Sequence, residues 1–326
     1  MYGSDLSPKR NGGTGMYGMK LIATGRALPE RVVTNDDMTQ YVETSDEWIT
    51  TRTGIRTRRF CGEGETAVSL AADAAKAALE RGGIDPQTID CLLVATSSGE
   101  YVMPSTACQV HGALSLREDA AVMDVGAACA GFLYALEAAR GLLAANGWRR
   151  ALVIGTEKMT NVLDMTDRNT CVLFGDGAGA AIFDLTEDTE YYSVCGTRSD
   201  MAIKVGGPRQ AQPMAMEGQD VFRFAVRTIP MCVEQLIAKA GITVDEVDHI
   251  VCHQANQRIL DASIRKLGVP AEKMYKNLDR YANTSAASIP LALAEMNEQG
   301  LLKAGQRVIL CGFGGGLTWS GIMLRI

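Results

Sequence analysis

Two segments of this chain resemble each other in order and spacing, and such an internal duplication limits the fold more than any other feature of the sequence. Residues 78–94 lie over residues 236–252, and Gly83 corresponds to Gly241, 158 positions later. Each copy has the pattern of a helix, a glycine that ends it, a short loop and a strand. Chance similarity between two amphipathic units is the alternative.

Two further pairs of segments follow in the same order. The turn at residues 128–130 precedes a helical pattern, as does the turn at residues 282–284, which comes 154 positions later. A strand that ends at Gly155 has a counterpart that ends at Gly312, 157 positions later. Chance does not explain the shared order, so we predict a duplicated α/β unit with buried sheets. Two such copies usually pack face to face, which would place a site made from corresponding turns between them.

Charge and cysteine content exclude several classes of protein. With 326 residues and a net charge of −6, the chain has no general basic field for nucleic acid or an anionic membrane. Charged residues such as Glu137 and Arg140 interrupt the apolar runs, so we expect no membrane-spanning segment. The nine cysteines include no Cys-x-x-Cys pair and follow no secretory signal. We therefore predict reduced thiols in the cytoplasm, with no disulfide framework and no metal site.

The predicted organisation has three parts. Residues 1–18 have almost no apolar pattern and are predicted to be a flexible leader, and an origin in expression is one interpretation of it. Folded structure is expected from Lys20. The two predicted halves cover residues 19–187, with the nucleophile, and residues 188–326.

Cys129 is the candidate nucleophile. Residues 122–125 have the pattern of a strand, and residues 126–131 form a turn of small residues that opens a helix. A helix N-terminus favours a thiolate over a thiol, because free N–H groups and the helix dipole stabilise negative charge. The alternative is a small buried hydrophobic residue, the interpretation that fits most of the other cysteines.

His253 and Asn283 are the candidate polar partners of Cys129. His253 directly follows a predicted strand, where α/β folds place reactive groups, whereas His111 and His249 lack that setting. Asn283 is predicted to occupy, in the second turn, the position that Cys129 holds in the first, although a helix cap is an alternative role. A Cys-His-Asn set also occurs in thiol proteases, whose turn is not doubled.

Two glycine-rich runs do not fit a dinucleotide-binding site. Residues 175–179 precede a strand pattern and residues 312–316 follow one, and neither has the G-x-G-x-x-G spacing before a helix. We expect these glycines to allow close backbone packing.

Together these residues carry a family resemblance. The chain resembles β-ketoacyl-acyl-carrier-protein synthase III from about Lys20 to its C-terminus. The matching motifs are residues 44–49, 51–56, 129–132, 174–181, 253–256, 283–288 and 313–316. The resemblance implies the thiolase fold, a duplicated α-β-α-β-α layered architecture, and a homodimer.

The resemblance also implies an acyltransferase that initiates type II fatty acid synthesis without a cofactor. Cys129 would take the acyl group from a short acyl-CoA primer such as acetyl-CoA, while the N–H groups of Cys129 and Gly315 hold the oxyanion. Malonyl-acyl carrier protein would then lose CO2, and His253 and Asn283 would stabilise the resulting enolate. Attack on the acyl-cysteine would give 3-oxoacyl-acyl carrier protein.

Binding roles are implied in the same way. Met103, supplied by the partner subunit, would close the primer pocket, and methionine there should admit acetyl groups and tolerate somewhat longer or branched short chains. The remaining assignments are CoA and pantetheine binding by Trp48, Arg52, Arg168, Gly218 and Asn256, and docking of acyl carrier protein by Arg223, Arg258, Arg265 and Lys266.

Three other functions stay open at this point. Cys311 precedes a glycine run, as the second cysteine of a thiolase does, but stands one residue farther from it than expected. A condensing enzyme of secondary metabolism would carry the same residues, whereas a non-catalytic acyl-CoA-binding homologue would not need them. Residues 197–213 are less similar to the family, which leaves the rim of the tunnel and the preferred primer undetermined.

Overall fold

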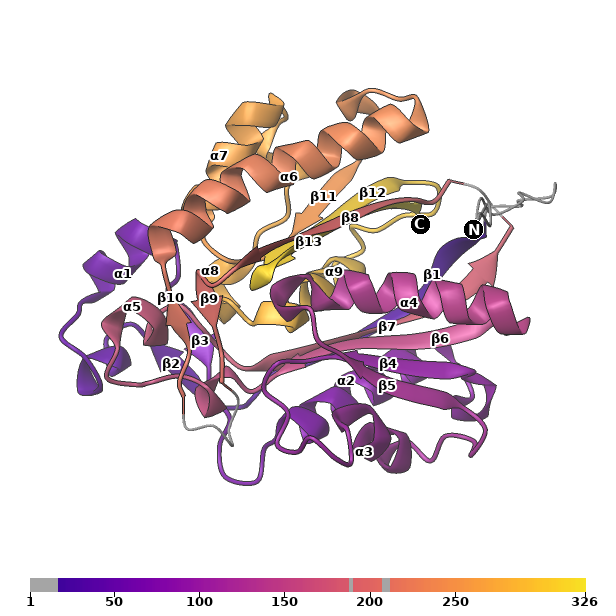
Figure 1. Ribbon diagram of the computed structural model, residues 1–326, viewed down its shortest axis with the longest axis horizontal. Helices are drawn as coiled ribbons and strands as arrows, with labels where there is room; N and C mark the ends of the chain where they lie inside the picture. Colours follow the sequence, from indigo (N-terminus) through magenta and orange to yellow (C-terminus); the bar gives the residue numbers. More distant parts are fainter. Residues whose placement is uncertain (1–16, 188–189, 207–211) are drawn as a thin grey trace, which may run out of the picture.

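The computed structural model describes residues 17–187, 190–206 and 212–326, which form five alternating layers of helices and sheets (Figure 1). Its strands are β1 (Gly18–Ala27), β2 (Val32–Thr34), β3 (Thr57–Arg59), β4 (Cys91–Ala95), β5 (Ala121–Val125), β6 (Arg150–Glu157), β7 (Gly177–Thr186), β8 (Tyr192–Asp200), β9 (Ile203–Lys204), β10 (Ala215–Met216), β11 (His249–Cys252), β12 (Arg307–Gly314) and β13 (Gly316–Arg325). One large sheet has the order β1-β7-β6-β4-β5 and the other has the order β11-β12-β13-β8. The predicted duplicated layers of the thiolase fold are confirmed.

Helices α2 and α3 cover the outer face of the first sheet, α6 and α7 cover the outer face of the second, and α4 and α9 lie between the sheets (Figure 1). The helices are α1 (Asp46–Thr53), α2 (Ala67–Gly82), α3 (Thr106–Ala113), α4 (Gly131–Asn146), α5 (Arg168–Cys171), α6 (Gly218–Ala240), α7 (Gln257–Leu267), α8 (Leu278–Tyr281) and α9 (Ser288–Glu298). Three buried apolar clusters fill the spaces between these layers, so each sheet is covered on both faces.

The two sheets repeat the same pairing pattern. β4 runs parallel to β6, and β6 and β7 are antiparallel, as are β7 and β1. β11, β12, β13 and β8 repeat this sequence of directions. The edge strand β5 has only a single-bridge counterpart, between Ile250 and Met274. Gly83 and Gly241 end the equivalent helices α2 and α6 in the left-handed conformation, with φ of 60° and 68°.

Aspartates at equivalent positions brace the two sheets. Asp90 N donates to Arg150 O at 2.9 Å, and Arg150 N donates to Asp90 Oδ2 at 2.7 Å. Asp248 and Arg307 make the same pair of contacts, at 2.9 and 2.8 Å. The duplication therefore extends to individual hydrogen bonds.

Ordered structure begins slightly before the predicted position. β1 starts at Gly18, and Met19 is buried, so the strand includes the last residue of the predicted leader. Residues 1–16 of that leader lie outside the described residues, as do residues 188–189 at the predicted boundary between the halves. The leader and this boundary stay predictions.

The central helix α4 is more apolar than the sequence suggested. With the short turn before it, residues 128–146, it is long and apolar enough to cross a membrane by length and composition. This differs from our expectation that charge interrupts every such run. Phe132, Leu133 and Leu136 of α4 are fully buried in the cluster between the two sheets, so its apolar face already has protein partners.

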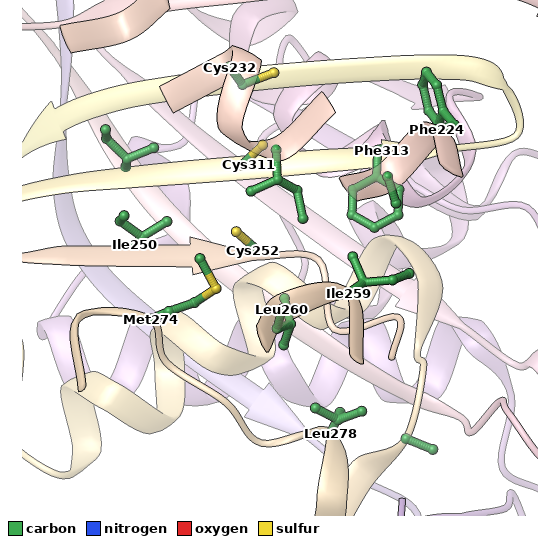
Figure 2. Packing of buried hydrophobic residues seen from close by; sticks show 14 of the residues in the cluster. Phe224, Cys232, Ile250, Cys252, Ile259, Leu260, Met274, Leu278, Cys311 and Phe313 are labelled. Carbon is green, nitrogen blue, oxygen red and sulfur yellow. The ribbon is translucent and has the colours of Figure 1, made fainter. Parts of the chain in front are cut away.

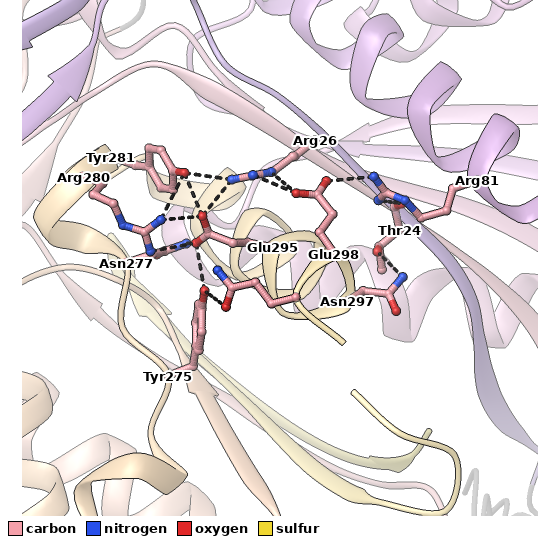
Figure 3. A network of polar contacts seen from close by, with 11 residues as sticks. Thr24, Arg26, Arg81, Tyr275, Asn277, Arg280, Tyr281, Glu295, Asn297 and Glu298 are labelled. Atoms are coloured by element: carbon pink, nitrogen blue, oxygen red, sulfur yellow. Dashed lines mark hydrogen bonds and ion pairs between the residues drawn. The ribbon is translucent and has the colours of Figure 1, made fainter. Parts of the chain in front are cut away.

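A polar network ties α9 to the first half (Figure 3). Glu295 accepts hydrogen bonds from Arg26 of β1 at 2.9 Å, from Arg280 at 2.6 Å and from the Tyr281 hydroxyl at 2.8 Å. Burial opposes the charged form of Glu295, but these donors outweigh it and lower the pKa of its carboxyl to about 2. The network fixes the segment that leads to Asn283.

Candidate active site

One cavity of about 150 Å³ lies where the two halves meet, and Cys129, His253 and Asn283 all line it. Most of its other walls are apolar, including Met159, Val162, Phe174, Met214, Phe222 and Phe313. Residues 207–211 of the uncertain rim lie outside the described residues. The structure therefore brings together the three residues singled out from separate parts of the sequence.

Cys129 lies in a short 3-10 turn between β5 and α4, in close contact with the glycine run after β12. Ala128 has a φ of 46°, which turns the chain sharply at the residue before the cysteine. A Cβ atom on Gly314 would lie 2.7 Å from Cys129 N, so only glycine fits there. Gly315 lines the cavity beside Cys129, and this geometry agrees with the two N–H groups expected for an oxyanion site.

The thiol of Cys129 is not acidified in the resting structure. The residue keeps part of its surface toward the cavity, but desolvation by the surrounding protein raises its pKa to about 12. A hydrogen bond from Sγ to Ser285 Oγ, at 3.4 Å, opposes this only in part. The prediction that the helix N-terminus favours a thiolate is therefore wrong for the resting protein, because burial is the larger effect.

The second turn does not place Asn283 opposite Cys129. A 3-10 turn covers 128–130 before α4 and 285–287 before α9, so Ser285 corresponds to Ala128. Ser285 also has a positive φ, 48°. Cys129 therefore corresponds to Ala286, and the predicted equivalence with Asn283 is wrong by three residues.

Each turn packs against a glycine of the opposite half. A Cβ atom on Gly155 of β6 would lie 2.2 Å from Ala286 O, and one on Gly312 of β12 would lie 3.1 Å from Ala130 Cα. Gly155 and Gly312 are the strand-end pair recognised in the sequence. The two turns are thus held by reciprocal backbone contacts.

Asn283 is anchored by its backbone and presents an amide group to the cavity. Its N–H donates to Leu173 O, and its carbonyl accepts from Gly175 N, both at 3.0 Å. Its Oδ1 accepts from Ser285 N at 2.8 Å. Since Oδ1 is occupied in this way, Nδ2 is the atom that can donate to a ligand.

His253 is buried and held in one orientation. Its backbone N–H donates to the backbone carbonyl of Cys311 at 2.8 Å. Its ring lies edge-on to the ring of Phe313, with centroids 5.2 Å apart. Nδ1 lies 2.7 Å from Ser288 Oγ, which also accepts from Gln254 N. The Ser288 hydroxyl can donate to Nδ1, and in that tautomer the ring proton is on Nε2. Burial lowers the pKa of His253 to about 3, so the imidazole is neutral at neutral pH.

The residues predicted to bind CoA fall into two groups. Gly218 and Asn256 line the cavity. Trp48 lies outside the cavity, next to two guanidinium groups. The Cζ atom of Arg52 lies 4.5 Å from the centroid of the indole ring, and that of Arg168 lies 4.9 Å from it. Asn256 links the groups, because its Nδ2 donates to Arg52 O at 3.1 Å. A continuous surface thus joins the indole to the cavity.

The four predicted docking residues are exposed on α6 and α7, the helices above the second sheet. Arg258 lies 6.0 Å from the ring of Phe222, a cavity residue, and Arg223 is next to Phe222 in the chain. Arg223 also forms an ion pair with Asp220. Arg265 and Lys266 occupy the last turn of α7.

Met103 does not reach the cavity of its own chain. The side chain is 83% exposed, as are large parts of its neighbours Tyr101 and Val102. Its assignment to the primer pocket depends on a second copy of the chain, as the resemblance implied, and stays a prediction.

Cys311 lies away from the cavity. It is fully buried on β12, and Figure 2 shows it between Cys232 and Cys252 in the apolar core under α6. A thiolase would need a second cysteine beside the first, so this position argues against that alternative. His111 and His249 bond to backbone carbonyls of Arg117 and Leu301, which agrees with packing roles.

The glycines of residues 175–179 serve close packing, as expected. A Cβ atom on Gly179 would lie 2.4 Å from Leu291 N of α9. This run therefore lets the first sheet approach the central helix and holds no nucleotide motif.

Sequence reasoning missed the polar residues behind the site. Ser285 and Ser288 contact Cys129 and His253, and Glu157 lies behind Ser285. The one available signal was the spacing of the turns, 154 positions instead of the 157 or 158 of the other pairs. Shifting the alignment of the second turn by three positions, to a spacing of 157, pairs Ala128 with Ser285 and would have drawn attention to Ser285.

Comparisons with known proteins agree with this geometry. Residues 123–199 match the 3-oxoacyl-[acyl-carrier-protein (ACP)] synthase III family, and residues 237–326 match its C-terminal part. The chain is 45% identical over 315 residues to a β-ketoacyl-[acyl-carrier-protein] synthase III of Rubrobacter xylanophilus, covering 95% of this chain and 99% of that one.

Two solved structures are also similar. The 3-oxoacyl-[acyl-carrier-protein] synthase III of Aquifex aeolicus has a TM-score of 0.90 at 40% identity, over 95% of this chain and all of that one. The priming β-ketosynthase of a polyketide biosynthetic pathway has a TM-score of 0.89 at 33% identity, over 95% of this chain and 96% of that one. By its sequence, its fold and the residues that meet in its cavity, the chain belongs to the β-ketoacyl-[acyl-carrier-protein] synthase III family.

Proposed function

We propose that the protein initiates fatty acid synthesis by condensing a short acyl-CoA with malonyl-acyl carrier protein, through an acyl group carried on Cys129. The observation that carries this proposal is the single cavity shared by Cys129, His253 and Asn283, with Cys311 outside it. A thiolase would need a second cysteine there, and a non-catalytic homologue would need none of the three residues.

In the first half-reaction, Cys129 Sγ attacks the thioester carbon and CoA leaves as a thiolate. The N–H groups of Cys129 and Gly315 receive the charge that develops on the carbonyl oxygen. The apolar walls exclude water, which protects the acyl-cysteine from hydrolysis. No cofactor is required for this exchange of one thioester for another.

In the second half-reaction, malonyl-acyl carrier protein loses CO2 and the electron pair passes to the thioester oxygen. His253 and Asn283 both line the cavity, and with the ring proton of His253 on Nε2 each side chain has an N–H group that can donate to that oxygen. A neutral imidazole suits this role, because it donates without first having to lose or gain a proton. The carbanion then attacks the acyl group and expels Cys129.

The substrates reach the cavity from the side of α6 and α7. Trp48, Arg52 and Arg168 offer a flat indole and two cations for the nucleotide part of CoA, and Asn256 continues this surface inward. The basic residues Arg223, Arg258, Arg265 and Lys266 suit an acidic carrier protein.

A second copy of the chain would complete the site. The segment with Tyr101, Val102 and Met103 is exposed, and β5 forms an edge of the first sheet with Met123 also exposed. An apolar edge of this kind is a usual place for pairing. We therefore include a homodimer, acting in the cytoplasm, in the proposal.

A related function in secondary metabolism is the second candidate. The 33% identity to a priming ketosynthase of a polyketide pathway favours it over the remaining alternatives. Both functions use the same half-reactions, and they differ in the primer and in the carrier protein.

The test is intact-mass analysis after incubation with a panel of acyl-CoAs, followed by malonyl-acyl carrier protein. We expect each accepted acyl group to add its mass to Cys129, and the carrier to remove it as a 3-oxoacyl thioester. Failure to acylate with any acyl-CoA would contradict the proposal. Acylation only by long or unusual primers would favour the secondary-metabolism function.

A further inference from the structure

This inference rests on the proposed function, which does not yet name the group that accepts the proton of the Cys129 thiol. Cys129 is a thiol at rest, so its hydrogen must leave Sγ as the thioester is attacked. The only hydrogen bond that Sγ makes within the described residues goes to Ser285 Oγ, at 3.4 Å. The proton path therefore begins at Ser285.

Glu157 is the acidic residue behind Ser285. It is the last residue of β6 and is fully buried. Its Oε2 accepts hydrogen bonds from Ser98 Oγ at 2.5 Å, from Ser97 N at 3.0 Å and from Thr96 Oγ1 at 3.3 Å. Its Oε1 is also buried and has no hydrogen-bond partner in the described part of the chain.

The side of Glu157 away from Ser98 faces the second turn. The Ser285 hydroxyl and the Ala286 N–H both favour its charged form, and its charge in turn acts on Cys129. The contact between Gly155 and Ala286 holds β6 against this turn. One oxygen is thus bonded within its own half, while the other is buried without a hydrogen-bond partner beside the second turn.

We propose that Glu157 accepts the proton of Cys129 through the Ser285 hydroxyl during acyl loading and returns it when condensation frees the cysteine. As Sγ bonds to the acyl carbon, its hydrogen passes to Ser285 Oγ and the Ser285 hydrogen passes to Glu157. CoA leaves as a thiolate and takes a proton from water. After condensation the Cys129 thiolate recovers the stored proton by the reverse path, so the carboxyl regains its charge. Glu157 acts through Ser285 and is a positioning residue that also stores a proton.

Burial supports the carboxylate over the imidazole as acceptor. Desolvation raises the pKa of Glu157, because protonation removes a buried charge, and it lowers the pKa of His253 to about 3, because protonation would create one. The neighbouring Lys158 donates its ammonium to Glu65 O at 2.8 Å. Cys129 is the titratable group that acts with Glu157.

The test compares Glu157→Gln and Ser285→Ala with the parent in single-turnover acylation by acetyl-CoA, followed by intact mass across a range of pH. We expect acylation to slow on the order of 10²-fold in both variants, as for loss of a general base, and its pH dependence to flatten. Decarboxylation of malonyl-acyl carrier protein, which moves no thiol proton, should stay within about twofold. Asp176→Asn is the matched control, because Asp176 is equally buried in the first half but bonds to Cys61 N and Thr160.

The outcomes separate this inference from the proposed function. If the parent protein does not acylate at Cys129, the proposed function fails. If the parent acylates and Glu157→Gln acylates at the same rate with the same pH profile, the proton path is overturned while the function stands. An equal loss of the acylation rate in Asp176→Asn would also overturn the proton path, because removing any buried carboxylate would then slow acylation. Should Glu157→Gln not fold, unchanged acylation by Ser285→Ala decides against the path.

Discussion

The two halves of the molecule have the same strand order but present different chemistry at equivalent turns. In the first half, a full strand β5 leads to Cys129, and β6 ends at the buried Glu157. In the second half, a single bridge at Met274 replaces β5, and the chain leads to Asn283 and Ser285. The comparison indicates that the duplicated scaffold fixes the positions of two turns, and that these turns carry different side chains, Cys129 on the first and Asn283 and Ser285 on the second.

The outer surfaces of the halves differ as well. The first sheet ends at β5, an edge strand with Met123 exposed. The second sheet has no such strand beside β11, and its outer helix α7 carries Arg265 and Lys266. One half therefore offers an apolar edge suited to another copy of the chain, and the other offers positive charge suited to an acidic partner.

The largest expected effect would break the assignment of the nucleophile to the first half. Cys129→Ala should abolish the acyl adduct formed with acetyl-CoA, because no other described cysteine lines the cavity. Intact mass provides the measurement. Cys311→Ala is the control and should still acylate, and an adduct on another cysteine of the Cys129→Ala protein would contradict the assignment.

The next effect would sharpen the assignment of acylation to the first turn and of decarboxylation to His253 and Asn283. His253→Ala or Asn283→Ala should slow malonyl decarboxylation and condensation on the order of 10²-fold or more, as for loss of an oxyanion donor. Acylation of Cys129 should stay detectable by mass. Equal loss of both half-reactions would instead indicate that His253 mainly activates the thiol.

A smaller effect concerns the network that anchors the second turn. Glu295→Gln removes a charge that Arg26 and Arg280 bond, and should lower the free energy of unfolding by roughly 1.5–3 kcal/mol at pH 7. Because the folded pKa of Glu295 is about 2, below its ordinary 4.5, this stability is present above pH 4.5 and is lost as pH falls toward 2.

Urea unfolding between pH 7 and pH 3.5 measures this contribution. The gap between the parent and Glu295→Gln should narrow below pH 4.5. Glu298→Gln, one turn later on α9 and more exposed, is the control and should cost less. A gap that does not change with pH would show that the loss reflects packing and not charge.

Charge reversal on the second half should have a still smaller effect. Arg265→Glu with Lys266→Glu should raise the KM for malonyl-acyl carrier protein on the order of tenfold at low salt, and less at high salt. Acyl-CoA loading should change little. Lys76→Glu with Lys303→Glu, a double reversal at exposed sites elsewhere, is the control. The docking assignment is falsified if loading falls as much as condensation.

The smallest effect concerns the edge of the first half. Met103→Phe should shift the acyl adducts from isobutyryl toward acetyl by roughly tenfold, the lower end of the effect of one methylene in an apolar pocket, which is about 1–3 kcal/mol. Competition between the two acyl-CoAs, followed by mass analysis, measures this. Val102→Phe is the matched control, and an unchanged distribution in Met103→Phe would remove this residue from the primer pocket.

The sequence predicted the fold and the lining residues because both depend on local patterns. The glycine stops at Gly83 and Gly241 and the small-residue turn at Cys129 are visible in single segments. The protonation of Cys129 was mispredicted, because desolvation by the folded protein outweighs the hydrogen bond to Ser285, 156 positions away. Local sequence cannot report how deeply a turn is buried by another part of the fold.

The reciprocal seating of each turn on a glycine of the other half has a consequence for biosynthesis. A ribosome releases the first half, with Cys129, before Gly312 and Gly314 have been made. Until the last strands have been synthesised, the turn that carries Cys129 lacks its contacts with Gly312 and Gly314. The cavity residues of the second half are then also missing. The cavity that Cys129 shares with His253 and Asn283 can therefore form only after both halves have been synthesised.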